Sequence, residues 1–295
     1  MARKTVVGIG EILWDVFADG KHLGGATANF ACHAQALGDR GCNVSRIGDD
    51  PLGREILERL GRLGLTTRYI QIDRRLPTGT VVVQVDRFGQ PDFTIIPDVA
   101  WDNIRPNPPL LRLARRAHAV CYGSLAQRGP VSGRTIRQVL LAARSALHVC
   151  DLNLRGRFLD LDASDGYRMA VVARSIGMAE VLKLNDDELA TVRRAFNRTE
   201  EGDALLLWLI REFGLWLVCV TRGAKGCVLR TARKRTESPG VRVKVVDTVG
   251  SGDAFTAALV HHLLRGRSFQ EVADFANRVG AFVASRPGAT PALEF

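Results

Sequence analysis

The chain has 295 residues, of which 46% are hydrophobic and 24% are charged. These values are typical of soluble globular proteins, so they exclude a fibrous or disordered chain, and the length allows one large α/β domain with a small appendage. The formal net charge of +10 would favour polyanionic partners, but the basic residues are scattered from Arg3 to Arg286. We therefore expect a generally basic surface and no nucleic-acid partner.

The six cysteines form no CxxC pair and several lie in apolar runs, which indicates buried free thiols in a reducing cytoplasm. The N-terminus has only a short apolar run without a small-residue cleavage site, so no signal peptide is predicted. The most apolar later stretch, residues 204–220, contains Arg211 and Glu212, which a membrane span would not readily tolerate. We expect a cytoplasmic protein that does not cross a membrane.

Short β-branched runs alternate with amphipathic segments of helical length, which predicts βαβ units and a mostly parallel central sheet. In chain order the predicted strands are 5–10, 43–47, 68–72, 117–122, 147–151, 181–184, 216–220, 227–230 and 241–246. The predicted helices are 26–37, 52–63, 132–144, 164–176, 201–213, 254–264 and 269–285, with Gly38 and Gly64 as stop signals after the first two. The basic cluster at 230–235 is predicted as a solvated turn.

Residues 77–101 interrupt this alternation because two extended runs, 80–86 and 92–96, follow each other without a helix and predict a β-hairpin. The extended stretch 12–23, with a turn at Asp19-Gly20, could pair with it. We expect residues 12–24 and 77–101 to form a β lid on a core of residues 1–11, 25–76 and 102–295; a functionless edge hairpin is the alternative. Val82 and Ile96 on the polar face of the hairpin suggest a homodimer in which two lids pack together.

The strongest functional pattern is the run 247–255, DTVGSGDAF, which follows a predicted strand and opens a predicted helix. Gly250 and Gly252 let the backbone approach an anion, and the free N–H groups at the start of a helix attract negative charge. Asp253 could then accept a proton from an attacking alcohol beside a bound phosphoryl group, with Ser251 in the same turn. A simple helix cap is the alternative role of Asp253, and a carboxylate at a helix N-terminus should titrate low.

This run resembles the C-terminal signature of the ribokinase-like (PfkB-type) carbohydrate kinases, DTxGAGD, with Ser251 where many members have Ala. The similarity covers the whole chain: GDDPLG at 48–53 and PTGT at 77–80 resemble further segments of that family. The opening GEILWDVF and the later Ala100-Trp101-Asp102 resemble its fructokinase branch. The resemblance implies a three-layer α/β/α fold with a small β-sheet lid, and an enzyme that uses ATP and Mg²⁺.

The resemblance also assigns the sugar-binding side of the site to Asp15, Gly24, Gly25 and Asn29. From the residues alone, Asp15 could accept two sugar hydroxyls and the glycines would let the ring lie against bare backbone, although all three are also ordinary turn residues. Arg155 ends the run Asp151-Leu152-Asn153-Leu154-Arg155, whose polar side chains share one face at the carboxyl end of the sheet. It could neutralise a phosphate or hold the sugar, or form a loop salt bridge with Asp151 or Asp160.

The nucleotide and metal side is likewise implied by family motifs. Asn185 and Glu188 resemble an NxxE element that holds Mg²⁺ through water, with helix capping as the alternative. Thr221, Gly223 and Gly226 resemble the nucleotide-side TxGxxG turn, and Asn277 matches a position near the adenine. Asp247, with the segment 286–289, resembles a monovalent-cation site for K⁺.

Three functions fit these observations, and no other phosphate motif such as GxxxxGK[ST] is present. The first is an ATP-dependent sugar kinase that phosphorylates a primary hydroxyl, with fructose as the expected substrate. The second keeps the chemistry but changes the substrate to ribose, 2-keto-3-deoxygluconate or a nucleoside. The third is a noncatalytic sugar-binding regulator, which the retention of Asp253, Gly250 and Gly252 disfavours.

Overall fold

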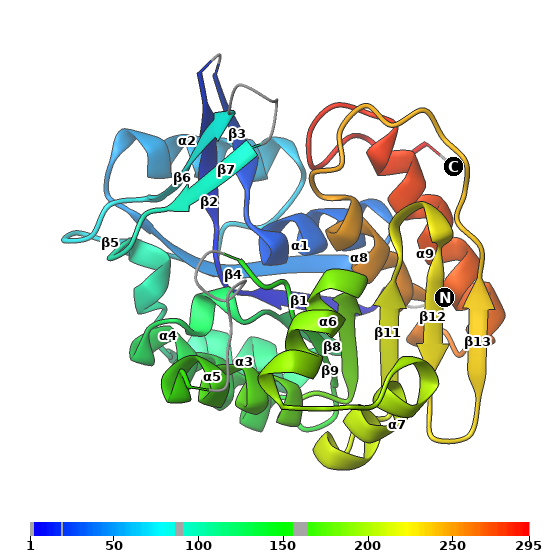
Figure 1. The fold of residues 1–295 in the computed structure, drawn as a ribbon. Helices are drawn as coiled ribbons and strands as arrows, with labels where there is room; N and C mark the ends of the chain where they lie inside the picture. The colour runs from blue at the N-terminus through cyan, green and yellow to red at the C-terminus, as the bar shows by residue number, and fades with distance from the viewer. Residues whose placement is uncertain (1–2, 19, 86–90, 156–163, 295) are drawn as a thin grey trace.

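The computed structural model describes residues 3–18, 20–85, 91–155 and 164–294, and in this part of the chain a large central sheet lies between two layers of helices (Figure 1). The strands of the sheet have the order β13-β12-β11-β10-β9-β8-β1-β4-β5. Neighbours from β5 to β11 are parallel, whereas β12 and β13 run antiparallel at one edge. The strands are β1 (Thr5–Ile9), β4 (Arg40–Gly48), β5 (Ile70–Asp73), β8 (Ala119–Tyr122), β9 (Leu147–Asp151), β10 (Val181–Asn185), β11 (Leu217–Thr221), β12 (Cys227–Arg230) and β13 (Arg235–Ser238). The predicted mostly parallel α/β sheet is confirmed.

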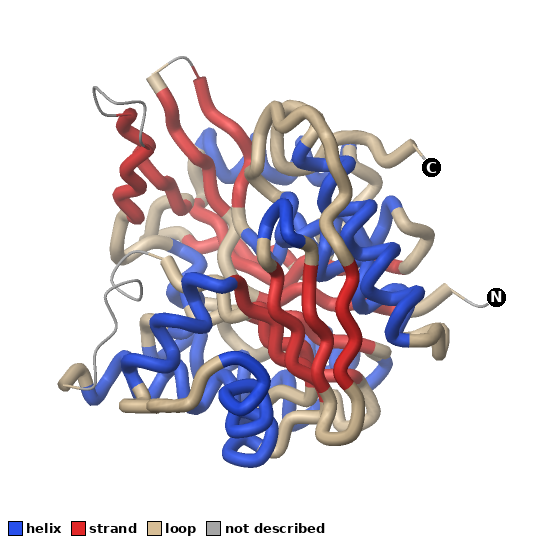
Figure 2. The backbone as a smooth tube through the Cα atoms, turned by 45° about the vertical axis from the view of Figure 1, so that its right-hand side comes forward, coloured by secondary structure: helices blue, strands red, loops and turns tan. Residues whose placement is uncertain are grey.

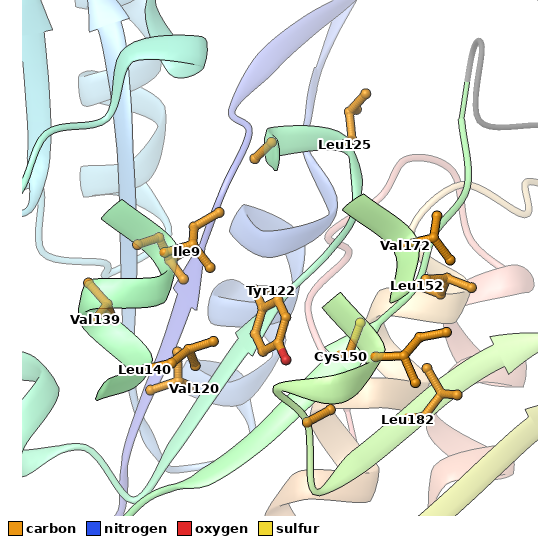
Figure 3. Close-up of a cluster of buried hydrophobic side chains, with 14 of the residues drawn as sticks. Ile9, Val120, Tyr122, Leu125, Val139, Leu140, Cys150, Leu152, Val172 and Leu182 are labelled. Carbon is orange, nitrogen blue, oxygen red and sulfur yellow. The ribbon is translucent and has the colours of Figure 1, made fainter. Parts of the chain in front are cut away.

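The helices cover both faces of this sheet, as the buried apolar clusters show. One layer contains α1 (Ala26–Ala36), α2 (Pro51–Arg62), α8 (Ser251–Leu263) and α9 (Phe269–Ala284); the other contains α3 (Pro108–Arg116), α4 (Pro130–Ala142), α5 (Gly166–Gly177), α6 (Asp186–Ala195) and α7 (Gly202–Phe213). Central strands are buried on both faces, which explains their continuous apolar sequences. In Figure 3 the ring of Tyr122 lies between the core side chains of neighbouring elements, and its hydroxyl donates to the Ser175 carbonyl at 2.9 Å. No described helix has the length and apolar character that a membrane crossing requires.

A second, smaller sheet stands off the central one and has the order β3-β2-β6-β7 (Figures 1 and 2). It contains β2 (Leu13–Phe17), β3 (Gly20–Gly24), β6 (Gly79–Val85) and β7 (Pro91–Ile95). β2 pairs in parallel with β6, so the predicted association of the stretch 12–23 with the hairpin is confirmed. Asp19 and the connection at 86–90 lie outside the described residues.

The segment that leaves this small sheet is fixed to the main core by Arg128. Its guanidinium donates to both Asp102 oxygens at 2.7 Å, donates to the Ile96 carbonyl at 2.8 Å, and stacks on the Trp101 ring. Trp101 is fully buried in the main core. The Ala100-Trp101-Asp102 motif, whose resemblance pointed to the fructokinase branch, therefore anchors the segment that leaves the small sheet.

The predicted strand 241–246 is wrong, because these residues form no ladder and the exposed fraction of Val245 is 60%. The last strand is instead β13, which begins in the basic cluster predicted as a turn. A Cβ atom at Gly240 would lie 2.0 Å from the Ala224 carbonyl, so the chain crosses closely over the turn at 223–226 and leaves the sheet there. It then meets the end of α9, where the Val246 amide donates to the Ala284 carbonyl at 2.9 Å. The alternation of valine with basic residues at 241–246 therefore did not indicate pairing with a neighbouring strand. The predicted helices also lacked α3, and the sequence indicated α6 only through the capping pattern at its start.

Candidate functional site

Several of the predicted site residues lie at the carboxyl ends of the central strands and at the helices that start beside them. Asn185 ends β10 and Thr221 ends β11, and these two residues are partners in the parallel register. α1 and α8 lie side by side over the sheet, and their first turns carry Asn29 and Asp253 (Figure 1). Open α/β sheets bind ligands at this edge.

Asp253 is the third residue of α8, and its carboxylate is held by a residue 224 positions away in sequence. The Asn29 amide Nδ2 donates to Asp253 Oδ2 at 2.8 Å, which joins the predicted sugar-binding side to the predicted catalytic group. Asn29 is buried, and its Oδ1 atom has no hydrogen-bond partner among the described residues. The side chain of Asp253 does not cap α8, because the N-cap is Gly250 and receives no side-chain bond.

Burial raises the pKa of Asp253 to about 7, and the nearby Asp151 carboxylate adds to the shift. The hydrogen bond from Asn29 and the charges of Lys183 and Arg155 act in the opposite direction. The expectation of a low pKa at a helix N-terminus is therefore wrong: removal of water from the carboxyl group outweighs the helix dipole. A carboxylate with this pKa is a better proton acceptor near neutral pH than an exposed aspartate.

The turn before Asp253 carries the residues of the predicted anion cradle. Gly250 has φ 76°, and a Cβ atom there would lie 2.3 Å from the Ala289 carbonyl, so only glycine fits. The Ser251 amide and hydroxyl both donate to the Thr248 carbonyl, at 3.2 and 2.8 Å. Within the described part of the chain, the amides of Gly252 and Asp253 donate to no protein acceptor. These two N–H groups are therefore available to an anion.

On the lid side, Asp15 lies in β2 opposite His22 of β3. A Cβ atom at Gly24 would lie 2.3 Å from Asp15 Oδ2, so the carboxylate rests over a bare glycine. Burial raises the pKa of Asp15 to about 6, against the opposing charges of His22 and Arg155. Gly25 is the N-cap of α1 with φ 110°, and a side chain there would strike the Glu11 carbonyl.

Arg155 is exposed and bonds the neighbouring Leu154 carbonyl at 3.0 Å; the residues that follow it, 156–163, are not described. Its positive charge opposes the rise in the pKa of Asp15, Asp253 and Glu11, so it lies within electrostatic reach of both sides of the site. Of the two partners in the alternative loop salt bridge, Asp151 pairs with Lys183, and Asp160 lies outside the described residues.

Asn185 and Glu188 form a reciprocal capping box at the start of α6. Asn185 Oδ1 accepts from the Glu188 amide at 2.8 Å, and Glu188 Oε2 accepts from the Asn185 amide at 2.9 Å. Glu188 Oε1 also accepts from the Leu154 amide at 2.9 Å, which fixes the loop that carries Arg155. Burial raises the pKa of Glu188, although the charge of Lys183 opposes the shift.

The predicted nucleotide-side residues form one packed unit. Gly223 and Gly226 have φ 53° and 83°, and a Cβ atom at Gly226 would lie 2.0 Å from the Ser238 carbonyl. Asn277 Nδ2 donates to Ser238 Oγ at 2.9 Å and to the Pro239 carbonyl at 3.1 Å, so α9 holds the segment that covers this turn.

Asp247 joins the approach to α8 to the C-terminal segment. Its Oδ1 accepts from the Val249 amide and its Oδ2 from the Gly288 amide, each at 2.9 Å. No group of three or more His, Cys, Asp or Glu side chains suited to a metal ion occurs among the described residues.

Sequence reasoning missed two charged groups at this site. Glu11, from the GE opening, is buried beside the start of α1, where Oε1 accepts from the Ala26 amide at 3.2 Å. Burial raises the pKa of Glu11 to about 7. Lys183 is the second group, and a lysine inside the apolar strand sequence Val-Leu-Lys-Leu was the available signal.

The comparison with known proteins finds the pfkB family carbohydrate kinases over residues 8–295. An uncharacterized sugar kinase of Pyrococcus horikoshii is 31% identical over 96% of this chain and 91% of its own length. Its crystal structure in complex with ATP has a TM-score of 0.80 and 28% identity, and covers 97% of this chain and 94% of that one. Fructokinase-2 of Oryza sativa is 30% identical over 98% of this chain and 90% of its own. The structure of fructokinase from Vibrio cholerae, bound to fructose, ADP and a calcium ion, has a TM-score of 0.81 at 26% identity and covers 98% and 95% of the two chains.

Proposed function

The chain belongs to the pfkB family of carbohydrate kinases, and on that premise we propose that it transfers the γ-phosphate of ATP to a primary hydroxyl of a sugar, with fructose as the first candidate. The family assignment makes the protein a phosphotransferase with an alcohol acceptor. The single observation that carries the proposal is the position of Asp253. Its carboxylate accepts a hydrogen bond from Asn29 on the sugar side. The residue itself belongs to the first turn of α8, which carries the free amides of Gly252 and Asp253.

This arrangement supplies what phosphoryl transfer requires, which is chiefly alignment and stabilisation of charge. The Asp253 carboxylate accepts the proton of the attacking hydroxyl while that oxygen bonds to the γ-phosphorus and the bond to the β-phosphate oxygen breaks. The amides of Gly252 and Asp253 hold the phosphoryl oxygens, and Arg155 offers a positive charge from the other side. Asp15, over Gly24 and Gly25, would hold the hydroxyls that do not react.

ATP is assigned to the side of Thr221, Gly223, Gly226 and Asn277. The exposed valines of the neighbouring segment 240–249 support this assignment, since an apolar surface beside a glycine turn suits the ring of a nucleotide base. The P. horikoshii relative has been crystallised with ATP, which further supports the choice of phosphate donor.

Mg²⁺ fits Asn185 and Glu188 only in part. Their side-chain oxygens suit this ion chemically, but each already accepts a backbone N–H, so these residues would hold Mg²⁺ through water molecules and phosphate oxygens. Such an ion would neutralise charge on the phosphates. K⁺ is proposed near Asp247, which accepts from the Gly288 amide, and near the Ala289 carbonyl, which lies close to the Gly250 turn. Higher turnover in K⁺ than in tetramethylammonium buffer is the expected evidence.

The substrate is tested by incubating the purified protein with ATP and Mg²⁺ and measuring ADP release with fructose, ribose, glucose, 2-keto-3-deoxygluconate and adenosine. We expect fructose to give the highest kcat/KM, in keeping with the fructokinase relatives. A different sugar as the best substrate would overturn the choice of fructose and leave the kinase assignment intact. Tight sugar binding with no ADP release from any compound would instead favour a regulator.

We also propose a cytoplasmic protein that forms a homodimer through its lids. Val82 on β6 is partly exposed, and so is Ile96, which follows β7 and also packs against the main core. Apolar residues on such a surface suit a self-complementary contact. Light scattering should give twice the mass of the 32.3 kDa chain at micromolar concentration. A Val82→Lys variant should shift this mass toward the monomer; a monomeric wild type would contradict the proposal.

A further inference from the structure

Lys183 is buried in the middle of the central sheet, where a charged side chain is costly unless it is paired. Its exposed fraction is 6%, and it is the one buried lysine or arginine among the described residues. Leu182 and Leu184 pack toward α3–α7, whereas Val181 packs toward α8 and α9. Because strand side chains alternate, Lys183 points toward α8.

The Lys183 ammonium is the start of a polar chain that reaches the first turn of α8. Lys183 Nζ donates to Asp151 Oδ1 at 3.0 Å and to Oδ2 at 3.2 Å, and the two residues are register partners on β10 and β9. Thr256 Oγ1 lies 2.7 Å from Asp151 Oδ2 and 2.9 Å from the Gly252 carbonyl. The first turn of α8 is thus tied to two strands.

The same ammonium lies beside the turn that carries the anion cradle. A Cβ atom at Gly252 would lie only 3.2 Å from Lys183 Nζ, so the cation approaches the backbone of this residue closely. Lys183 therefore contributes positive charge at the turn where the phosphoryl group would bind.

Several charged groups from different elements surround Asp253. They are Asp151 at the end of β9, Lys183 on β10 and Arg155 after β9. The neutral thiol of Cys121 on β8 also faces Asp253. Glu188 on α6 and Glu11 after β1 interact with Asp151 and Arg155. Asp151 and Asp253 are two carboxylates in one water-poor site, and the charge of Asp151 opposes the ionisation of Asp253. Lys183 interacts favourably with both and with Glu188.

We propose that Lys183 is a positioning residue for phosphoryl transfer, which neutralises Asp151, keeps Asp253 ionisable as the base and supports the Gly252 turn from behind. This inference rests on the proposed kinase function for its kinetic consequence. Its electrostatic part concerns the protonation of Asp253 alone and is measurable without turnover.

The test is a double-mutant cycle of Lys183→Met, Asp151→Asn and the two together, with Lys234→Met at an exposed turn as the control. Removal of the cation should move the acidic limb of the pH profile of kcat/KM to higher pH by about one unit, because Asp253 then holds its proton more tightly. Asp151→Asn should move this limb to lower pH, and the double variant should fall between the two single variants. Lys234→Met should match the wild type.

A loss of kcat in Lys183→Met with an unmoved limb would show a purely structural role and overturn the proposal. If the single variant does not fold because Asp151 is left unpaired, the comparison of Asp151→Asn with the double variant measures the same shift in a background without that carboxylate. An unchanged limb between these two variants would also overturn the proposal.

A ¹³C NMR titration of aspartate-labelled protein, with the Asp253 signal assigned from Asp253→Asn, separates this inference from the proposed function. The Asp253 midpoint should rise by about one unit in Lys183→Met even if no sugar is phosphorylated. Failure of the sugar panel with the NMR shift present would reject the kinase proposal alone. An unchanged NMR midpoint together with active wild-type enzyme would reject the role of Lys183 alone.

Discussion

Replacement of Asp253 by Ala should lower kcat by about a thousandfold or more, whereas the dissociation constant for the sugar should change by less than about tenfold. The reason is geometric. Asp253 is the side chain that could take the proton of the attacking hydroxyl, and it lies between Asn29 and the free amides of the cradle. Steady-state ADP release gives kcat, and calorimetric titration with the sugar gives its affinity.

Asp253→Asn is the matched control, because it keeps the shape of the side chain and the acceptor for Asn29 but removes the charge. Since burial raises the pKa of Asp253 in the folded protein to about 7, from an ordinary value near 4, ionisation opposes folding as the pH rises through this interval. The Asn variant should therefore be at least as stable as the wild type at pH 8 in thermal unfolding, although it keeps only a small residual activity. Wild-type turnover in either variant would remove Asp253 from the mechanism.

The same pKa predicts the pH dependence of the wild type. The base must be ionised in the free enzyme, so kcat/KM should fall as the pH decreases below about 7 and should level off above it. The limb should disappear from the small residual activity of Asp253→Asn.

The sequence was informative wherever one local pattern decides the outcome. The run 247–255 predicted a glycine turn before a helix, and the structure has this turn with Gly250 at φ 76°. Gly38 and Gly64 ended their helices in the same way, each with positive φ. In both cases the required backbone conformation is accessible mainly to glycine, so the residue identity carries the structural information.

Prediction failed where distant segments decide. The alternation at 241–246 favoured a strand, but the packing of Gly240 against Ala224 directs the chain away from the sheet. The position of Asp253 on the helix predicted a low pKa. That prediction failed because the burial of its carboxyl group and the charge of Asp151 depend on strands that are far away in sequence. The contact from Asn29 to Asp253 spans 224 positions, and no local pattern could show it.

Gly250→Ala provides the second large expected effect, because it changes the cradle without touching any functional side chain. An alanine at φ 76° costs about 1–2 kcal/mol in backbone strain, and its Cβ atom would lie 2.3 Å from the Ala289 carbonyl. Backbone atoms must therefore move, and the amides of Gly252 and Asp253 would move with them. A displacement of this kind costs on the order of a hundredfold in rate, so kcat/KM should fall by about that factor.

Gly266→Ala is the matched control at the opposite end of the same helix. Gly266 has φ 64°, similar to that of Gly250, but a Cβ atom there meets no described atom within 4 Å. Both variants should lose about 1–2 kcal/mol of stability from backbone strain. Only Gly250→Ala should also lower kcat/KM. Comparison of kcat/KM with the free energy of unfolding in urea for the two variants separates strain from displacement of the cradle. Equal losses of activity in both would mean that the turn at Gly250 does not hold the phosphoryl group, since helix strain alone would then explain the effect.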